Sequence, residues 1–200
     1  MKITIWSLKG GVGKTSIALN LALSCNCKII TNERYSLLTD VLNEENLLQL
    51  GVSEKIPQLG KEDKIIFDMG GTVDKRIIDC LKQSELVLVP TTANDIDIQG
   101  CISTVMELQD YIEKEKITII VNNTTGKKDL EKVRSIINQI CEHKYKFFEL
   151  KRSRALVNIF DSKKSIKEMS KKGLRKNSYR KINEQFNNLI NFIEGKNEKI

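Results

Sequence analysis

The stretch Leu8-Lys9-Gly10-Gly11-Val12-Gly13-Lys14-Thr15 decides the fold of this 200-residue chain. An apolar run, Ile3 to Trp6, precedes it and is typical of a buried strand, while residues 16–23 follow it and are typical of a helix. A glycine-rich turn between a strand and a helix is a setting in which backbone N–H groups can surround a phosphate. The stretch therefore predicts a phosphate-binding loop.

Each residue type in this loop has a physical role. Glycines let the backbone close around an anion without Cβ clashes, and the N-terminus of the following helix adds partial positive charge. Lys14 supplies a full charge for β- and γ-phosphates, and the Thr15 hydroxyl can ligate Mg²⁺. We expect nucleotide contacts from Gly10, Gly11, Val12, Gly13, Lys14, Thr15 and Ser16.

The usual form of this loop, G-x-x-x-x-G-K-[ST], begins with glycine, and here that position is Leu8. The stretch instead contains a second lysine, Lys9, and so resembles the deviant Walker A loop of the ParA/MinD superfamily of dimerising ATPases. In that family the extra lysine reaches across a dimer interface to the partner's nucleotide. The resemblance implies ATP or ADP as ligand and catalytic roles for Lys9 and Lys14. The alternative is a glycine-rich turn with two solvated lysines.

Length and composition fit one soluble domain. Charged residues make up 30% of the chain and hydrophobic residues 40%, which is ordinary for a globular protein. No apolar run approaches the roughly 20 residues that span a bilayer, and the N-terminus lacks the layout of a signal peptide. We expect a single domain over residues 1–200, located in the cytoplasm, with its five cysteines reduced and mostly buried.

Alternating apolar and amphipathic segments indicate the fold class. Strands are predicted at 3–6, 28–31, 64–68, 85–90, 116–121 and 146–150, and helices at 16–23, 74–83, 95–114, 127–142, 162–172 and 178–194. Residues 33–50 are predicted to be helical or irregular. Apolar strands that alternate with helices favour an α/β fold with a mostly parallel central sheet and helices on both faces. With the loop above, this predicts a P-loop NTPase fold.

The net charge of +7 is unevenly distributed. Residues 151–181 contain twelve lysines and arginines but only two acidic residues, so the rest of the chain is slightly acidic. Such asymmetry within the basic C-terminal segment (about 151–194) indicates a polyanion partner. The candidate DNA contacts are Arg152, Arg154, Lys171, Lys172, Arg175 and Lys176. The alternative is a solvated surface with no ligand.

Asp68 is the second strong candidate site. It ends an Ile/Phe-rich strand some fifty residues after the loop, which fits a Walker B aspartate that holds Mg²⁺ through water. Gly70 and Gly71 follow it and would let the backbone move when a γ-phosphate arrives. The alternative is an ordinary helix-capping or turn aspartate.

Two further segments resemble the same superfamily. Residues 87–100 match its strand–proline–threonine segment at Pro90, Thr91 and Asp97, a region that lies at the nucleotide and dimer face in relatives. Asn122 ends an apolar strand and resembles the asparagine that recognises adenine, because its amide both donates and accepts. The alternatives are a first-turn helix residue for Asp97 and a strand-terminating turn for Asn122.

One position departs from the superfamily pattern. Relatives carry an aspartate at the end of the second strand, where it orients the attacking water, and here the sequence is Ile30-Thr31-Asn32-Glu33-Arg34. We hypothesise that Glu33 takes this catalytic role, and unchanged stimulated turnover in Glu33→Gln would remove it. Otherwise hydrolysis is slow or depends on an activator.

The resemblance implies a small ParA-type partition ATPase. ATP would close a homodimer that binds DNA without sequence preference, on the nucleoid. Hydrolysis, stimulated by a small centromere-binding partner protein, would release it. A MinD-like membrane-associated positioning ATPase is the main alternative, although no membrane binding is expected. An ATP-binding DNA module with very low turnover is the third.

Overall fold

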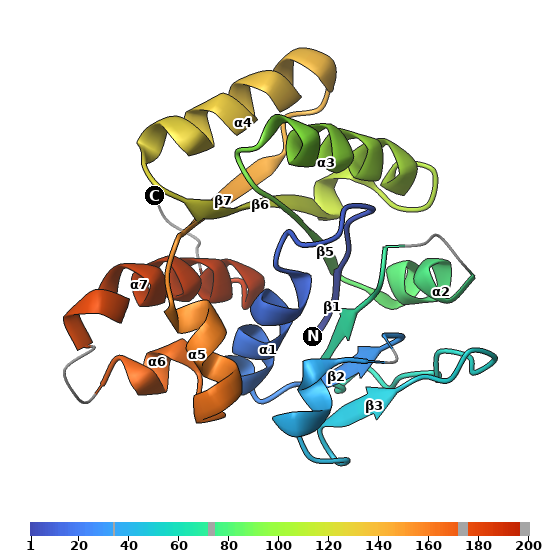
Figure 1. Ribbon diagram of the computed structural model, residues 1–200. Coiled ribbons are helices and arrows are strands. Elements are labelled where there is room, and N and C mark those ends of the chain that lie inside the picture. Colours follow the sequence, from blue (N-terminus) through green and yellow to red (C-terminus); the bar gives the residue numbers. More distant parts are fainter. Residues whose placement is uncertain (34, 72–74, 172–175, 197–200) are drawn as a thin grey trace.

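The computed structural model describes residues 1–33, 35–71, 75–171 and 176–196 (Figure 1). In that part of the chain, seven strands form one sheet in the order β3-β2-β4-β1-β5-β6-β7, with every neighbouring pair parallel. The strands are β1 (Lys2–Ile5), β2 (Lys28–Thr31), β3 (Leu47–Gln49), β4 (Ile65–Asp68), β5 (Leu86–Thr91), β6 (Ile117–Thr124) and β7 (Lys146–Lys151). The predicted parallel α/β sheet is confirmed.

Helices cover both faces of the sheet, as Figure 1 shows. On one face lie α1 (Lys14–Cys25), α5 (Ala155–Ser162), α6 (Ile166–Met169) and α7 (Lys176–Ile193), and on the other α2 (Lys75–Gln83), α3 (Asp95–Leu108) and α4 (Lys127–Ile140). Side chains alternate across a strand, so Ile66 of β4 packs in the α1 layer while Ile65 and Phe67 pack against the α2 and α3 layer. This double burial explains why the strands are apolar at nearly every position.

The structure differs from the sequence prediction at the edge strand β3 and at the end of α3. Residues 33–50 contain a 3₁₀ turn, Leu37–Asp40, and the edge strand β3, which pairs only with β2. Helix α3 ends at Leu108 rather than 114, and a second 3₁₀ turn, Lys114–Lys116, precedes β6. The prediction of one helix through 95–114 was therefore too long.

The predicted helix at 162–172 is confirmed only in part, as the short helix α6 (Ile166–Met169), and the helix before it was not predicted. Helix α5 occupies Ala155–Ser162, and Lys163 ends it in the left-handed region with φ 54°. A new helix, α6, begins only after Ser165, whose hydroxyl accepts the Glu168 N–H while the Glu168 carboxylate accepts the Ser165 N–H. This capping box restarts the chain in a new direction. Lys172, the last residue of the prediction, lies outside the described residues.

Because all seven strands are parallel, their carboxyl ends meet at one edge of the sheet. The phosphate-binding loop after β1, Asp68 of β4, the 91–97 segment after β5 and Asn122 of β6 all lie along that edge. Ligands of open α/β sheets bind outside the carboxyl ends of the strands. The topology thus places the predicted site residues along one edge, although they are far apart in sequence.

Candidate nucleotide-binding site

The loop between β1 and α1 takes a shape that requires glycine. Gly11 and Gly13 adopt φ 79° and 96°, in the left-handed region. At Gly13 there is a second constraint, because an added Cβ would lie 2.3 Å from the Asn122 Nδ2. Helix α1 begins at Lys14, and no side chain among the described residues caps it. Its first N–H groups are therefore directed toward the loop, where they can bind an anion.

Lys14 is held inside this loop. Its side chain is buried, and its Nζ donates to the Lys9 carbonyl over 3.2 Å. A buried ammonium bound to one neutral carbonyl retains unused donors. A phosphate in the loop would supply anionic acceptors in place of solvent, so the arrangement fits the predicted phosphate-binding role.

Asp68 lies at the end of β4, beside β1, and is almost fully buried. Neither of its carboxylate oxygens has a hydrogen-bond partner among the described residues. Burial raises the pKa of Asp68 to about 7; the neighbouring Thr15 hydroxyl lowers this pKa, Glu33 raises it and Lys14 lowers it. A buried carboxyl group without partners is unfavourable unless something else satisfies it.

Mg²⁺ fits this position. Its preferred ligands are oxygens, commonly a carboxylate, hydroxyls, waters and substrate phosphates, and Asp68 and Thr15 supply a carboxylate and a hydroxyl side by side. When bound, the ion would offset the negative charge of a nucleotide's phosphates. The unsatisfied Asp68 oxygens are the structural sign of such a site.

The segment after β4 lies close to the loop. The Gly70 N–H donates to the Asn32 Oδ1 over 2.7 Å, and the Trp6 Nε1 donates to the Gly70 carbonyl over 3.2 Å. A Cβ at Gly71 would stand 2.9 Å from the Leu8 carbonyl oxygen. The backbone at Gly71 therefore packs against the backbone at Leu8, and a displacement of residues 70–71 would shift the loop. Residues 72–74 lie outside the described part of the chain.

Glu33 lies near this segment. Its Oε1 is 3.7 Å from the Cβ position of Gly70, and its charge is among the causes that raise the pKa of Asp68. The structure thus brings Glu33 close to the Walker B position, as its proposed role requires, while that role itself stays a prediction.

Lys9 packs against α3. Its Cβ is 3.0 Å from the Cβ position of Gly100, so glycine is needed for this close approach. Asp97, one turn earlier in α3, accepts a hydrogen bond from the Thr92 hydroxyl over 2.7 Å. The segment matched at 87–100 therefore contacts the loop, and its place at a dimer face stays a prediction.

Asn122 lies directly behind the loop, a contact that the sequence did not predict. Its Nδ2 donates to the Val12 carbonyl over 3.0 Å, and its buried Oδ1 has no partner among the described residues. Recognition of adenine by Asn122 stays a prediction. The observed contact shows that Asn122 also supports the loop's backbone, and no local sequence signal could have revealed this.

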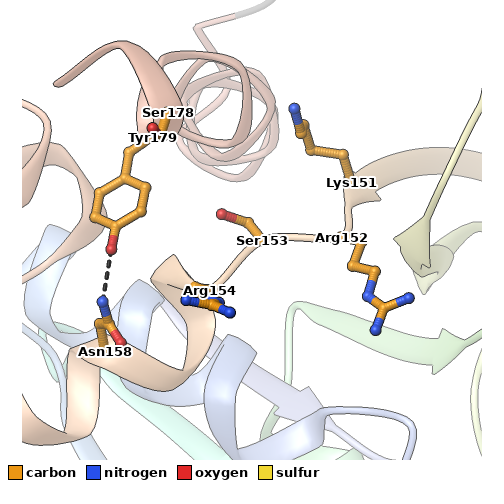
Figure 2. A pocket seen from close by; sticks show the side chains of 7 residues that line it. All are labelled: Lys151, Arg152, Ser153, Arg154, Asn158, Ser178 and Tyr179. Carbon is orange, nitrogen blue, oxygen red and sulfur yellow. Dashed lines mark hydrogen bonds between the residues drawn. The ribbon is translucent and has the colours of Figure 1, made fainter. Parts of the chain in front are cut away.

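The candidate DNA contacts are only partly described. Arg152 and Arg154 are exposed on the segment between β7 and α5, and Lys171 is exposed after α6. Lys172 and Arg175 lie outside the described residues, as does the side chain of Lys176 at the start of α7. Figure 2 shows Arg152 and Arg154 lining a cavity of about 400 Å³ with Lys151 and Tyr179.

Gly13→Ala is expected to damage the loop strongly. The new methyl group would collide with the Asn122 amide, and alanine at φ 96° is strained by about 1–3 kcal/mol. We expect nucleotide affinity, measured by isothermal titration calorimetry, to fall at least tenfold. Gly10→Ala is the matched control, because nothing lies within 4 Å of a Cβ there and φ is not in the left-handed region. Equal affinity losses in the two variants would contradict the steric argument.

Comparisons with known proteins agree with this geometry. Residues 3–182 match the family described as the CobQ/CobB/MinD/ParA nucleotide-binding domain. A plasmid partition protein from Borrelia burgdorferi, bound to AMPPNP, superposes with a TM-score of 0.57 at 19% identity, over 92% of this chain and 97% of that one. MinD from Aquifex aeolicus gives 0.60 at 17% identity (99% and 97%), and a McdA–ATP complex from Cyanothece gives 0.62 at 13% identity (100% and 98%). No curated protein sequence matches the chain.

Proposed function

This chain belongs to the CobQ/CobB/MinD/ParA family of nucleotide-binding domains, and from that premise we propose that it is an ATP-dependent DNA partition protein. ATP closes two protomers into a homodimer that binds DNA without sequence preference. Hydrolysis, stimulated by a small centromere-binding partner, releases the dimer. The proposed site of action is the cytoplasm, on the nucleoid. The γ-phosphate has to favour the dimer by a few kcal/mol for such a switch to work.

The ATP half of the proposal rests above all on Asp68. This buried carboxylate has no hydrogen-bond partner in the described ranges, and with Thr15 beside it and Lys14 nearby it suits a Mg²⁺–nucleotide better than any purely structural role. The uncapped N-terminus of α1 and the left-handed glycines suit its phosphates. The Borrelia burgdorferi partition protein binds AMPPNP and the Cyanothece McdA binds ATP within the same fold.

In the proposed cycle each residue has a separate task. The Lys14 ammonium leaves the Lys9 carbonyl and binds the phosphates instead. Lys9, packed on α3, reaches the partner's nucleotide. Glu33 orients the attacking water by accepting a hydrogen bond from it. Because Gly71 packs on Leu8 of the loop and Gly70 is bonded to Asn32, the segment after β4 can respond to loss of the γ-phosphate.

The DNA half rests on the basic segment. Phosphate contacts need positive charge and little else, and residues 151–181 carry twelve basic residues against two acidic ones. A membrane-bound alternative would need an exposed apolar stripe on the last helix, α7. In the structure Phe186 and Leu189 of that stripe are buried in the core. Among the described residues, no helix has the length and apolar character needed to cross a bilayer.

A second function is favoured by one observation. The end of β2 carries no aspartate, and the Asn32 side chain in that region is engaged with the Gly70 N–H. A DNA-binding module that binds ATP but hydrolyses it very slowly fits this departure. Steady-state ATPase measurements with and without DNA and partner protein distinguish it from the partition cycle.

The test of the proposed function is a gel shift on a non-specific duplex with no nucleotide, ADP, ATP or a non-hydrolysable ATP analogue. We expect binding only with ATP or the analogue, and none for Lys14→Ala. Binding that ignores the nucleotide would contradict the switch. Absence of DNA binding in every nucleotide state would contradict the partition function itself.

A further inference from the structure

Two adjoining cavities lie at the carboxyl ends of β6 and β7. The first, of about 400 Å³, is lined by residues 151–154 with Asn158, Ser178 and Tyr179. The second, of about 470 Å³, is lined by residues 124–127 with Glu149, Lys181 and Gln185. Lys151 and Arg152 line both, so the two cavities adjoin at these residues, and together they are here called the β6–β7 groove. In Figure 2 the Lys151 and Arg152 side chains leave the chain in opposite directions.

The β6–β7 groove gathers positive charge from four elements. Its cations are Lys127 at the start of α4, Lys151 and Arg152 at the end of β7, Arg154 before α5, and Lys181 of α7. Within the described part of the chain, none of these five side chains forms an ion pair. Unpaired cations around a concave surface attract a polyanion far more than scattered ones do.

Glu149 is the only acidic residue among the described residues that line the groove. Its carboxylate accepts the Thr124 hydroxyl over 2.7 Å and the Gln185 Nε2 over 3.2 Å. The Gln185 Oε1 in turn accepts the Lys151 N–H over 2.9 Å. Glu149 is thus fixed by neutral partners, and in the described part of the chain no ion pair compensates its charge.

We propose that the β6–β7 groove is the track on which the phosphate backbone of duplex DNA lies, and that Glu149 limits the affinity. This rests on the proposed function and extends it to Lys127, Lys151 and Lys181. The groove offers phosphates what they require, which is several cations with neutral donors between them. The Ser153 hydroxyl accepts the Ala155 N–H and so keeps its proton free to donate.

The position of the groove relates it to the nucleotide. Strand β6 carries Asn122, which is bonded to the Val12 carbonyl of the loop, and two residues later Thr124, which is bonded to Glu149. One strand therefore contacts both sites. This fits a protein in which DNA contact depends on nucleotide state.

The experiment measures fluorescence anisotropy of a labelled non-specific duplex with the ATP analogue, from 50 to 200 mM salt. We expect Lys127→Ala and Lys181→Ala each to weaken binding several-fold and to reduce the slope of log K against log salt by about 1. Lys82→Ala, an exposed lysine of α2 that lines neither cavity, is the matched control and should bind as the wild type does.

Glu149→Gln should act in the opposite direction and strengthen binding several-fold. Glutamine keeps both contacts, since its amide nitrogen can donate to the Thr124 hydroxyl while its oxygen accepts from Gln185. A role that is only structural would not give a gain of affinity. Thermal unfolding of each variant verifies that the fold is intact.

The outcomes separate this inference from the proposed function. If Lys127→Ala and Lys181→Ala bind like Lys82→Ala while Lys171→Ala binds more weakly, the groove is not the track although the protein still binds DNA. If the wild type binds no duplex in any nucleotide state, the proposed function falls first. Sedimentation with phosphatidylglycerol vesicles that is lost in Lys127→Ala would then assign the groove to lipid phosphates and overturn the inference.

Discussion

Asp68→Asn is expected to make the nucleotide-free protein more stable while it lowers ATP turnover by about 100-fold or more, because a magnesium-binding carboxylate is lost. The two effects have one cause. The Asp68 carboxylate is buried without a hydrogen-bond partner among the described residues, which is costly for folding and useful for holding a cation. An asparagine removes the buried charge and with it the ligand for Mg²⁺. Urea unfolding and a coupled ATPase assay measure the two effects.

The stability effect depends on pH in a defined direction. Burial raises the pKa of Asp68 to about 7 in the folded protein, against about 4 in the unfolded chain. Between these values the folded state binds more protons, so the free energy of unfolding falls as pH rises from about 4 to about 7. The difference between the folded and unfolded pKa values corresponds to about 4 kcal/mol of unfolding free energy. In Asp68→Asn this decline should disappear.

Asp129 provides the matched control. The Thr125 N–H and hydroxyl both donate to its carboxylate, and they lower the pKa of Asp129. Its contribution to stability is therefore present above the unfolded pKa and is lost as the pH falls below it, so Asp129→Asn should destabilise the protein at neutral pH. If Asp68→Asn also destabilised it there, the carboxylate would have a partner in the folded state and the argument for an incomplete cation site would fail.

The residues whose chemistry follows from local sequence were the predictable part of this molecule. Local sequence patterns predict the loop, the strand that ends in Asp68 and the alternation of strands and helices. No local pattern predicts the pairing of β3 with β2, because Leu-Leu-Gln lacks the β-branched residues that favour strands. This edge strand forms because one side of β2 has unpaired backbone groups in the assembled sheet, and β3 pairs with them.

Helix α5 was missed for a different reason. Ala155, Leu156 and Ile159 have helical spacing and are all buried. Three basic residues stand just before them, Lys151, Arg152 and Arg154, and for that reason the segment was assigned to the charged surface and not to a helix. Likewise, the contact of Asn122 with Val12 joins residues 110 apart. Long-range contacts of this kind decide how the loop is held, and no local pattern encodes them.

Lys9→Ala is the second change expected to have a very large effect. If Lys9 acts on the partner's nucleotide, its removal should lower stimulated turnover by about 10³-fold, as for other cations supplied in trans. ATP affinity should change little, because Lys14 contacts the backbone carbonyl of Lys9, which alanine retains. Separate measurement of ATP binding and of turnover therefore distinguishes Lys9 from Lys14.

Mixing two inactive variants tests whether Lys9 acts across the dimer. A Lys9→Ala protomer keeps Asp68, and an Asp68→Asn protomer keeps Lys9, so in a mixed dimer one site receives both groups only if Lys9 is supplied by the partner. A 1:1 mixture should then recover roughly a quarter of wild-type turnover, since half of the randomly formed dimers are mixed and each has one complete site of two. A mixture as inactive as its two components would mean that Lys9 serves its own nucleotide, and that its packing on Gly100 of α3, rather than a partner's phosphate, explains the second lysine of the loop.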